Sequence, residues 1–385
     1  MVFMGEIKVF LRQGSHPLYS QLVQYPPKGV IFQKSSLTTV EDKGIVKNFK
    51  RFAWDQVTKL RPPIFHVNSG DANLIHSAYG SLISNEKNWV VDVEHGASFA
   101  KYHVKSLENE NYRRKIIELL TSPFCKKIMP WTHAASRSVL GYFGNPSIER
   151  KIEVIYPALK PRNIPINKDD GIFRILVTNR FFYEKGGKQA LDAFAILSKK
   201  YDVQMDVLAP VPQEIKRQYG QIKNLNFVDK IFVNEPGGVE EMFKEYYSKA
   251  HLMLHLTFGD TFGYVLLEAM SMEIPIIGSD MFSMPEIVED GKNGFIVELP
   301  FQPLEDKWKI KYHKEFGNFN ILMDRIKNDR SNFADVVAKK AEELINDSSL
   351  RKQMGKNGRK MIEKGKFSIP YRNRKLLNVY KESIE

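Results

Sequence analysis

The chain alternates short apolar runs with stretches of helical periodicity, and this alternation limits its fold more than any other feature. We predict first-half strands at residues 7–11, 30–33, 73–76, 89–93, 127–131 and 153–156. Helices are predicted between them at residues 108–120 and 134–143. Connections of this length suit a helical crossover and are too long for a hairpin, so the strands are expected to be parallel. The pattern is typical of an α/β protein.

The second half repeats the alternation and then ends in a run of helices. Strands are predicted at residues 173–178, 204–208, 251–256 and 274–278. Helices are predicted at residues 187–200, 239–248 and 263–271, and then at 319–327, 333–345, 349–363 and 371–385. Two doubly wound sheets of similar size are therefore expected.

A proline-rich break separates the two halves. Pro157, Pro161 and Pro165 fall within nine residues, a spacing that continues neither a helix nor a central strand. Because open parallel sheets bind ligands at the carboxyl ends of their strands, we expect two domains that face each other across a cleft holding the active site. The expected segments are an N-terminal domain at 1–160, a linker at 161–171, a second domain at 172–365, and a C-terminal helix at 366–385 that packs back on the first domain.

The composition is that of a globular protein without a membrane span. Hydrophobic residues make up 43% of the chain and charged residues 26%. No run reaches the ~18 uninterrupted apolar residues that a spanning helix needs. Cys125 is the only cysteine, which excludes an internal disulfide and a cysteine-rich zinc site. Because the first residues also lack the apolar stretch and cleavage site of a secretory signal, we expect a cytoplasmic protein.

The positive charge is concentrated in the first half. Residues 1–170 carry 24 Lys and Arg against 15 Asp and Glu, a net charge of +9 out of +12 for the chain. Such a face suits nucleic acid, anionic lipid headgroups or a phosphorylated substrate, and a solvated surface without a partner is an equal alternative. Since no nucleic-acid-reading motif is recognisable, we expect no nucleic-acid partner and keep an anionic membrane surface as a hypothesis.

The most informative segment is a strand, loop and helix at residues 257–270. The loop ends near Gly263, where a helix N-terminus presents backbone N–H groups and the positive end of its dipole to an anion. Because glycine has no side chain, a phosphate can approach the backbone closely there. Asp260 precedes the helix and Glu268 lies within it. The two carboxylates are therefore candidates for accepting hydrogen bonds from ligand hydroxyls.

A second group of candidates follows the strand predicted at residues 173–178. Arg180 and Lys185 lie after its carboxyl end, which is a suitable place for binding a diphosphate. Gly186 and Gly187 then open the next helix. Taken alone, an Arg and Lys pair of this kind is more often a surface feature, so its meaning depends on the other motifs.

Three patterns in order give these residues a family context. They are Arg180 to Lys185, Asp260 to Glu268, and the segment Pro285-Glu286-Ile287-Val288-Glu289-Asp290-Gly291-Lys292-Asn293-Gly294. Over residues 172–300 the chain resembles the retaining, metal-independent family 4 glycosyltransferases of the GT-B fold. The resemblance implies two Rossmann-like doubly wound domains that face each other across a cleft. It also implies a nucleotide-diphosphate sugar as co-substrate, with no cofactor and no metal.

The resemblance assigns roles to individual residues. Arg180 and Lys185 would neutralise the donor diphosphate. Glu268 would hold the ribose hydroxyls, and Asp260 would lie near the transferred sugar. Backbone N–H groups at three consecutive positions would bind the distal phosphate of the donor: Gly263, Tyr264 and Val265.

Two departures from the family pattern are visible. The family usually has Glu where this chain has Asp260, so the carboxylate is one methylene shorter. We expect this change to alter the choice of sugar or to weaken activity. The small glycine-rich segment that precedes the Pro-Glu pair is replaced by Phe282-Ser283-Met284, which we expect to crowd the donor pocket.

The first half offers less specific candidates. His95 follows the strand at residues 89–93, where many relatives carry a histidine facing the donor sugar, and it is our catalytic candidate in this half. Gly14 is the candidate counterpart of a glycine-rich loop near the phosphates, and His76 is assigned a structural role. No cluster of His, Cys and Asp has convincing metal-ligand spacing.

The sequence therefore predicts a retaining transfer of a sugar from a nucleotide diphosphate to a hydroxyl of a glycan, glycolipid or lipid-linked acceptor. The catalytic candidates are His95, Arg180, Lys185 and Asp260. One alternative is a catalytically silent glycosyltransferase-like subunit, and another is a sugar-nucleotide epimerase or phosphorylase of the same fold. The protein is expected in the cytoplasm, with the inner face of the membrane as a hypothetical peripheral site.

Overall fold

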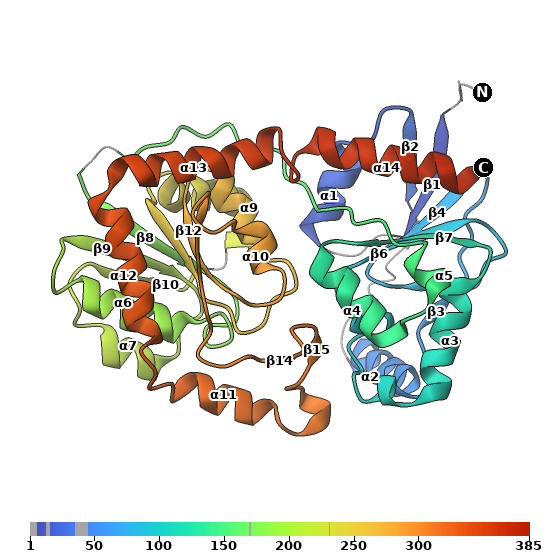
Figure 1. Cartoon of the computed structure of the whole chain (residues 1–385), viewed down its shortest axis with the longest axis horizontal. Coiled ribbons are helices and arrows are strands. Elements are labelled where there is room, and N and C mark those ends of the chain that lie inside the picture. The colour runs from blue at the N-terminus through green and yellow to red at the C-terminus, as the bar shows by residue number, and fades with distance from the viewer. Residues whose placement is uncertain (1–5, 13–15, 35–44, 169–170, 231) are drawn as a thin grey trace. The chain divides into compact units, whose positions relative to one another are not determined.

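The computed structural model describes residues 6–12, 16–34, 45–168, 171–230 and 232–385. The chain divides into two compact units. Unit 1 comprises residues 1–158, 308–316 and 369–385, and unit 2 comprises residues 159–307 and 317–368. In each unit helices pack around a parallel sheet (Figure 1). Among the described residues, no helix is long and apolar enough to cross a bilayer.

Unit 1 contains a five-stranded sheet in the order β2-β1-β4-β6-β7, with all neighbours parallel. Its strands are β1 Ile7–Arg12, β2 Val30–Lys34, β4 Leu74–Ser77, β6 Trp89–Val93 and β7 Cys125–Pro130. All residues of β4 and β6 are buried, as expected for central strands of a sheet covered on both faces. The short strands β3 Ile64–Phe65 and β5 Leu82–Ile83 pair separately.

Helices cover this sheet, and side chains cap several of them. The Asn109 and Thr132 side chains accept the N–H groups of Tyr112 and Ala135 at the starts of α3 and α4. The helices of unit 1 are α1 Pro17–Gln24, α2 Ile45–Leu60, α3 Glu110–Thr121, α4 His133–Phe143, α5 Pro146–Glu149 and α14 Ile369–Ile384. Short 3-10 helices occupy Gly96–Ala100, Ser106–Glu108 and Lys314–Phe316.

Unit 2 contains a six-stranded parallel sheet in the order β10-β9-β8-β11-β12-β13. Its strands are β8 Phe173–Thr178, β9 Val203–Leu208, β10 Leu225–Val228, β11 Leu252–His255, β12 Ile276–Ser279 and β13 Gly294–Val297. The chain fills one side of the sheet from β8 outwards and then returns to fill the other side from β11. The switch point of this Rossmann-type order therefore lies between β8 and β11, where such sheets bind ligands.

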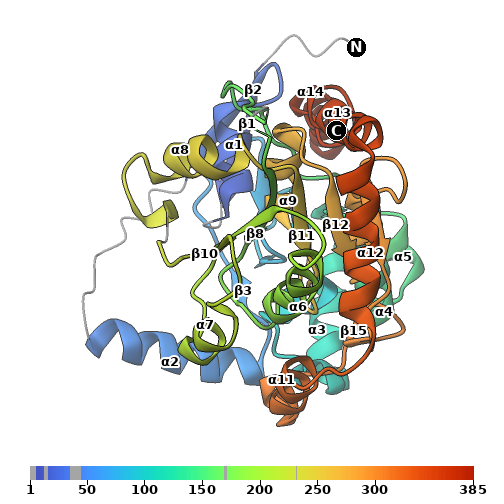
Figure 2. The same ribbon diagram turned by 90° about the vertical axis from the view of Figure 1, so that its left-hand side faces the viewer.

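The helices of unit 2 cover both faces of its sheet, with α12 against α6 and α13 against α9 (Figure 2). The main helices are α6 Gly187–Leu197, α7 Gln213–Tyr219, α8 Gly238–Met242, α9 Tyr264–Ser271, α10 Met284–Ile287, α11 Phe319–Lys327, α12 Phe333–Asn346 and α13 Ser348–Glu363. A 3-10 helix lies at Phe232–Asn234, and a π-helix at Phe243–Tyr247 follows α8 directly. Two short strands, β14 Leu304–Glu305 and β15 Lys309–Ile310, lie on either side of the unit boundary in the sequence.

One predicted strand is wrong, and the backbone chemistry explains why. Residues 153–156 form no strand, and the neighbouring Ile152 makes only an isolated bridge to Ile128 of β7. The Glu153 and Ile155 N–H groups donate to the carbonyls of Ile128 and Pro130, and the Ile128 N–H donates back to Lys151. The next return bond would need an N–H on Pro130, and proline has none, so the ladder ends there.

Two further differences concern helices and the domain boundary. The helix predicted at 239–248 is split into α8 and the π-helix Phe243–Tyr247. The segment 308–316, expected within the second domain, belongs to unit 1. It attaches there through Glu315, whose carboxylate lies 2.8 Å from His103, and through Trp308, whose ring packs against Tyr142 at 5.1 Å.

Candidate functional site

The motif residues of unit 2 meet at the carboxyl ends of β8 and β11, which is the switch point of the sheet. Arg180 and Lys185 follow β8, and Asp260 lies in the loop after β11. The Phe258 N–H donates to the Glu184 carbonyl at 2.7 Å and ties the two loops together. Residues about 75 positions apart in sequence are thus held side by side by backbone bonding.

Gly263 shapes the start of α9. Its φ of 68° is in the left-handed region, which glycine adopts without steric cost. A Cβ added there would lie 3.3 Å from Leu266 and from Met284, so little room remains for a side chain. Tyr264 and Val265 are the first two residues of α9, where backbone N–H groups point out of the helix. The geometry suits an anion at this helix start.

Asp260 and Lys185 form the charged centre of the loop. One carboxylate oxygen of Asp260 lies 2.6 Å from the Lys185 ammonium, and the other accepts the Gly263 N–H at 3.1 Å. His255 Nε2 lies 3.4 Å from the same carboxylate. Burial raises the pKa of Asp260, but the nearby Lys185 charge, with His255, outweighs it and holds this pKa far below its ordinary value. Asp260 therefore carries a negative charge at every physiological pH.

Lys185 keeps binding capacity beyond this ion pair. Its ammonium donates to Asp260 and, at 2.7 Å, to the Gly259 carbonyl. An ammonium has three N–H donors, so one further acceptor can bind without breaking either contact. Arg180 is exposed at the end of β8, beside Phe181, whose side chain is also exposed.

Glu268 belongs to a separate polar group on α9. The Tyr247 hydroxyl lies 3.4 Å from its carboxylate, and burial raises the pKa of Glu268 to about 7. The charge of Arg162 acts in the opposite direction and lowers that pKa. The Arg162 guanidinium lies 4.3 Å above the Phe243 ring, and Phe243 stacks on Tyr247 at 4.5 Å.

Sequence reasoning missed Arg162 and Tyr247 as neighbours of Glu268. Both aromatic rings of this stack, Phe243 and Tyr247, come from the π-helix, a rare element that is frequent at functional sites. The helical periodicity of this segment is continuous, so the sequence carries no signal for the π-turn. Arg162 lies in the proline-rich linker, where the pattern indicates only a break.

The segment that replaces the family's small residues packs beneath the glycine loop. Phe282 is buried with a φ of 44°, a left-handed conformation that is strained for a bulky side chain. The Ser283 hydroxyl donates to the Thr261 carbonyl at 2.6 Å, and Met284 lies against Gly263. The larger side chains therefore pack against the loop at Thr261 and Gly263 and support it.

His95, the candidate in unit 1, is bound on both ring nitrogens. Nδ1 accepts the Ala97 N–H at 3.1 Å, so the proton lies on Nε2, which donates to the Trp308 carbonyl at 2.8 Å. Burial lowers the pKa of His95 to about 4, which keeps the ring neutral. In this state the ring has no nitrogen left for a sugar. Gly14 lies outside the described residues.

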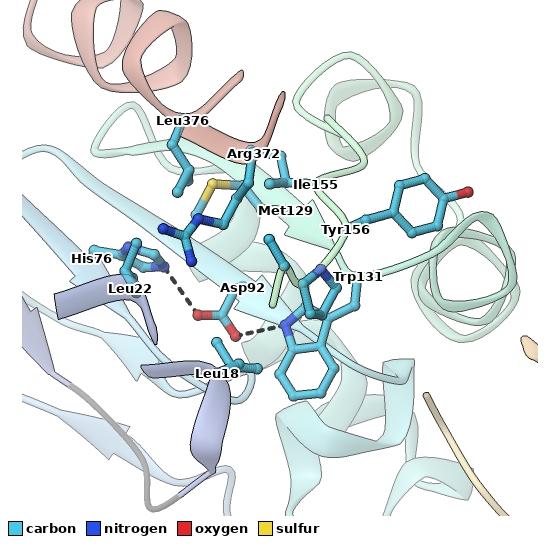
Figure 3. Close-up of a pocket in the computed structure, with 12 residues that line it drawn as sticks. Leu18, Leu22, His76, Asp92, Met129, Trp131, Ile155, Tyr156, Arg372 and Leu376 are labelled. Carbon is cyan, nitrogen blue, oxygen red and sulfur yellow. Dashed lines mark hydrogen bonds and ion pairs between the residues drawn. The ribbon is translucent and has the colours of Figure 1, made fainter. Parts of the chain in front are cut away.

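A second polar group of unit 1 lies beside a small cavity (Figure 3). Asp92 is 6% exposed and accepts the Tyr19 hydroxyl at 2.7 Å and the Trp131 indole N–H at 3.0 Å. His76 lies 3.0 Å from the other Asp92 oxygen and 2.7 Å from the Tyr380 hydroxyl on α14. The adjoining cavity of about 40 Å³ is room for a water and not for a sugar. The group therefore holds α1, α14 and the sheet together.

Metal ligation finds no support in the side chains that the structure describes. Within that part of the chain, no group of three or more His, Cys, Asp and Glu residues could hold a metal ion. The carboxylates of Asp260 and Glu268 instead face cationic or hydroxyl partners from the protein itself.

Comparison with known proteins gives this site its context. The family model described as glycosyl transferases group 1 matches residues 161–312. The capsular polysaccharide biosynthesis glycosyltransferase CapM of Staphylococcus aureus is 26% identical over 239 residues, which are 60% of this chain and 51% of CapM. The amylovoran biosynthesis glycosyltransferase AmsK of Erwinia amylovora is 24% identical over 279 residues, covering 66% and 65%. The chain thus spans between half and two thirds of the length of these two relatives.

Solved structures agree over nearly the whole chain. A glycosyltransferase from Rickettsia africae superposes with a TM-score of 0.59 and 14% identity, covering 98% of this chain and 90% of its own. Anabaena HepE in complex with UDP-glucose gives a TM-score of 0.59 and 13% identity, covering 97% and 99%. At such identities the likeness concerns the fold. The chain has the GT-B fold of two Rossmann-like units, and residues 161–312 match the glycosyl transferases group 1 model.

Proposed function

We propose that this protein is a retaining, metal-independent glycosyltransferase that uses a nucleotide-diphosphate sugar. The observation that carries the proposal is the loop at the switch point of unit 2, where Lys185, Asp260 and Gly263 are bonded together at the start of α9. It is supported by the group 1 family match and by the glycosyltransferase names of its relatives.

The chemistry follows from where charge develops. As the bond between sugar and diphosphate breaks, the leaving diphosphate gains negative charge and the sugar gains positive charge. The third N–H donor of Lys185, the Arg180 guanidinium and the start of α9 stabilise the leaving group. Asp260 remains ionised and stabilises the positive charge on the sugar. Glu268 accepts hydrogen bonds from the ribose hydroxyls.

These residues replace the role of a metal ion. Two cationic side chains and a helix N-terminus supply positive charge to a diphosphate directly. Retention of configuration follows from attack by the acceptor on the face that the diphosphate leaves, with the departing phosphate taking the acceptor proton. No covalent nucleophile from the protein is needed, and His95, bound on both nitrogens, supplies none.

The acceptor is proposed to be a hydroxyl of a glycan or of a lipid-linked glycan. CapM and AmsK are named for polysaccharide biosynthesis, and the basic first half suits an anionic acceptor or a membrane surface. Co-sedimentation with anionic liposomes at physiological salt tests the membrane hypothesis. Equal recovery with neutral liposomes would reject it.

The experiment that tests the activity is a screen of UDP-, GDP- and ADP-sugars, measuring thermal shift and donor hydrolysis with EDTA present. One donor is expected to raise the unfolding midpoint of the wild type and to be hydrolysed slowly with retained anomeric configuration. Glu268→Ala is expected to lose the shift. Asp202→Asn, a change at an exposed carboxylate (79% of its side chain), is the matched control and is expected to keep it.

The screen also separates the alternatives. A donor-dependent shift without hydrolysis or transfer would favour a catalytically silent subunit, a possibility raised by the short Asp260 carboxylate bound to Lys185. Turnover that requires free phosphate would favour a phosphorylase. Activity that appears only after a divalent metal is added would contradict the metal-independent mechanism.

A further inference from the structure

A second hollow of unit 2 lies at the opposite edge of its sheet. Two cavities of about 330 and 420 Å³ share Lys168, His251 and Arg351 in their linings. They lie where β8 and β11 begin, and Phe173, the first residue of β8, lines one of them. The donor loop, which contains Lys185, Asp260 and Gly263, follows the carboxyl ends of the same two strands. Since β8 has six residues at ~3.3 Å each, about 20 Å separates the two places.

The lining of these cavities is strongly basic. One carboxylate, Glu273, faces four cations: Lys168, Arg351, Lys352 and Lys356. Within the described ranges, no carboxylate lies within ion-pair distance of any of these four cations. The neighbouring Asp169 and Asp170 lie outside the described residues.

The two inner cations are held by carbonyl groups. The Lys168 ammonium donates to the carbonyls of Met272 and Glu273 at 3.1 and 2.7 Å, just beyond the last residue of α9. Arg351 donates to the carbonyl of Ile345 at 3.3 Å near the end of α12. Carbonyl dipoles orient a cation but carry no full charge. Both side chains also line the cavity, and the Asp347 carboxylate offsets part of the Arg351 charge.

Burial disfavours the charged form of Lys168 in the free protein. Desolvation lowers the pKa of Lys168 to about 7, while Glu273 raises this pKa and Arg351 lowers it further. A bound anion would favour the charged form of Lys168 and would repay part of the desolvation cost. At neutral pH about half of the Lys168 groups are therefore charged in the free protein, and an anion that enters the cavity would increase that fraction.

Size and charge define the ligand class. A volume of about 330 Å³ is within the range of small-molecule sites. Ser348, the first residue of α13, also lines the cavity, and its hydroxyl can donate to an anion. The start of the helix itself is capped by the Asp347 carboxylate, which accepts the Leu350 N–H at 2.8 Å. We propose that unit 2 has a second ligand site, formed by Lys168, Arg351, Lys352 and Lys356, for a small phosphate ester or another compact dianion. The site is independent of the donor chemistry proposed above.

The test uses inorganic phosphate as the probe and the unfolding midpoint as the readout, with chloride at matched ionic strength. All proteins carry Lys185→Ala, which weakens phosphate binding by the donor loop to the same extent in every variant compared. Phosphate is expected to stabilise this parent saturably. Lys352→Gln/Lys356→Gln is expected to weaken the apparent Kd about tenfold, because two cations that face the ligand are lost. Both lysines are exposed, so the variant is expected to fold.

Lys360→Gln/Lys364→Gln is the matched control, since it removes the same charge at the same spacing, beyond the cavity lining. It is expected to leave the Kd unchanged. An equal loss in both double variants would overturn the proposal, because the effect would then be one of net charge. No saturable stabilisation of the parent would also overturn it. So would binding that appears only in Asp169→Asn/Asp170→Asn, since the chain's own carboxylates would then fill the site.

Discussion

The two units place polar side chains at the same position of the same kind of sheet and use them differently. In unit 1, Asp92 and His95 lie in and just after β6, and every polar atom described for them is bonded within the unit. In unit 2, Lys185 and Asp260 also follow parallel strands and bond to each other, but Lys185 retains a donor. A position after a strand therefore identifies a candidate binding residue. The hydrogen bonds that the residue already makes determine whether it can bind a ligand.

The difference has an energetic basis. A buried polar group that is fully satisfied stabilises the fold, and a ligand can use it only by breaking a contact. The Asp92 and His95 groups of unit 1 are of this kind. The loop of unit 2 instead keeps a charged pair partly exposed, at 16% and 18% of the Lys185 and Asp260 side chains, so that a ligand can add to it.

The largest expected effect is on Lys185. Lys185→Ala is expected to lower the transfer rate by about 10²–10³-fold, because it removes a cation aimed at the leaving diphosphate. The measurement is the steady-state rate with the donor that the screen identifies. Lys223→Ala, at a side chain that is 81% exposed, is the control and is expected to keep the full rate. A loss below tenfold would remove Lys185 from the mechanism.

The pH dependence of donor binding tests the role of Glu268 in unit 2. Its pKa of about 7 means that about a tenth of the groups are ionised at pH 6 and about nine tenths at pH 8. If the carboxylate binds the ribose, the donor Kd is expected to fall about tenfold between these pH values. Glu268→Gln is expected to bind weakly with no such slope, whereas an unchanged slope in that variant would assign it to another group.

The raised pKa of Glu268 also predicts the direction in which the stability of the protein changes with pH. Burial raises the pKa of Glu268 in the folded state above its ordinary value of 4.5. Its contribution is therefore fully present below pH 4.5 and is lost as the pH rises through 7. Relative to Glu268→Gln, the wild type is expected to lose about 3 kcal/mol of unfolding free energy over this window. Urea unfolding at each pH measures the difference.

His95 tests unit 1. His95→Ala is expected to lower the unfolding free energy by about 2–3 kcal/mol, because it leaves the buried Ala97 N–H and the partly buried Trp308 carbonyl without their partner. His66→Ala, at an exposed ring, is the control and is expected to change stability little. A variant that keeps its stability but loses turnover would show that His95 acts on the substrate, and the contrast between the units would fail.

The smallest expected effect concerns Phe282, whose φ is 44°. Both Phe282→Ala and Phe282→Gly lose the packing of a buried ring, but only glycine adopts this backbone conformation without strain. The glycine variant is expected to be more stable than the alanine variant by about 1 kcal/mol in urea unfolding. The opposite order, which is usual outside the left-handed region, would show that the loop relaxes when the ring is removed.

The regular elements were largely predictable from the sequence. The strand predicted at 173–178 is β8 with the same bounds, and the strand at 89–93 is β6. Apolar runs in parallel strands are continuous and easily recognised. The elements not predicted include the helices α1, α2 and α7 and the edge strand β10. The partly exposed residues of β10 break the continuity of its apolar run.

From strand periodicity the sequence by itself predicted two doubly wound parallel sheets, because periodicity is a local property of the chain. Its resemblance to the family 4 glycosyltransferases supplied the GT-B fold and the candidate donor residues, among them Asp260 and Glu268. Tertiary structure alone decided the rest. It brought Lys185 to Asp260, placed Arg162 and Tyr247 near Glu268, and bound both nitrogens of His95. These outcomes depend on contacts between residues far apart in the chain, whose bonding no local pattern encodes. The partners that a side chain contacts in the folded protein determine its chemistry.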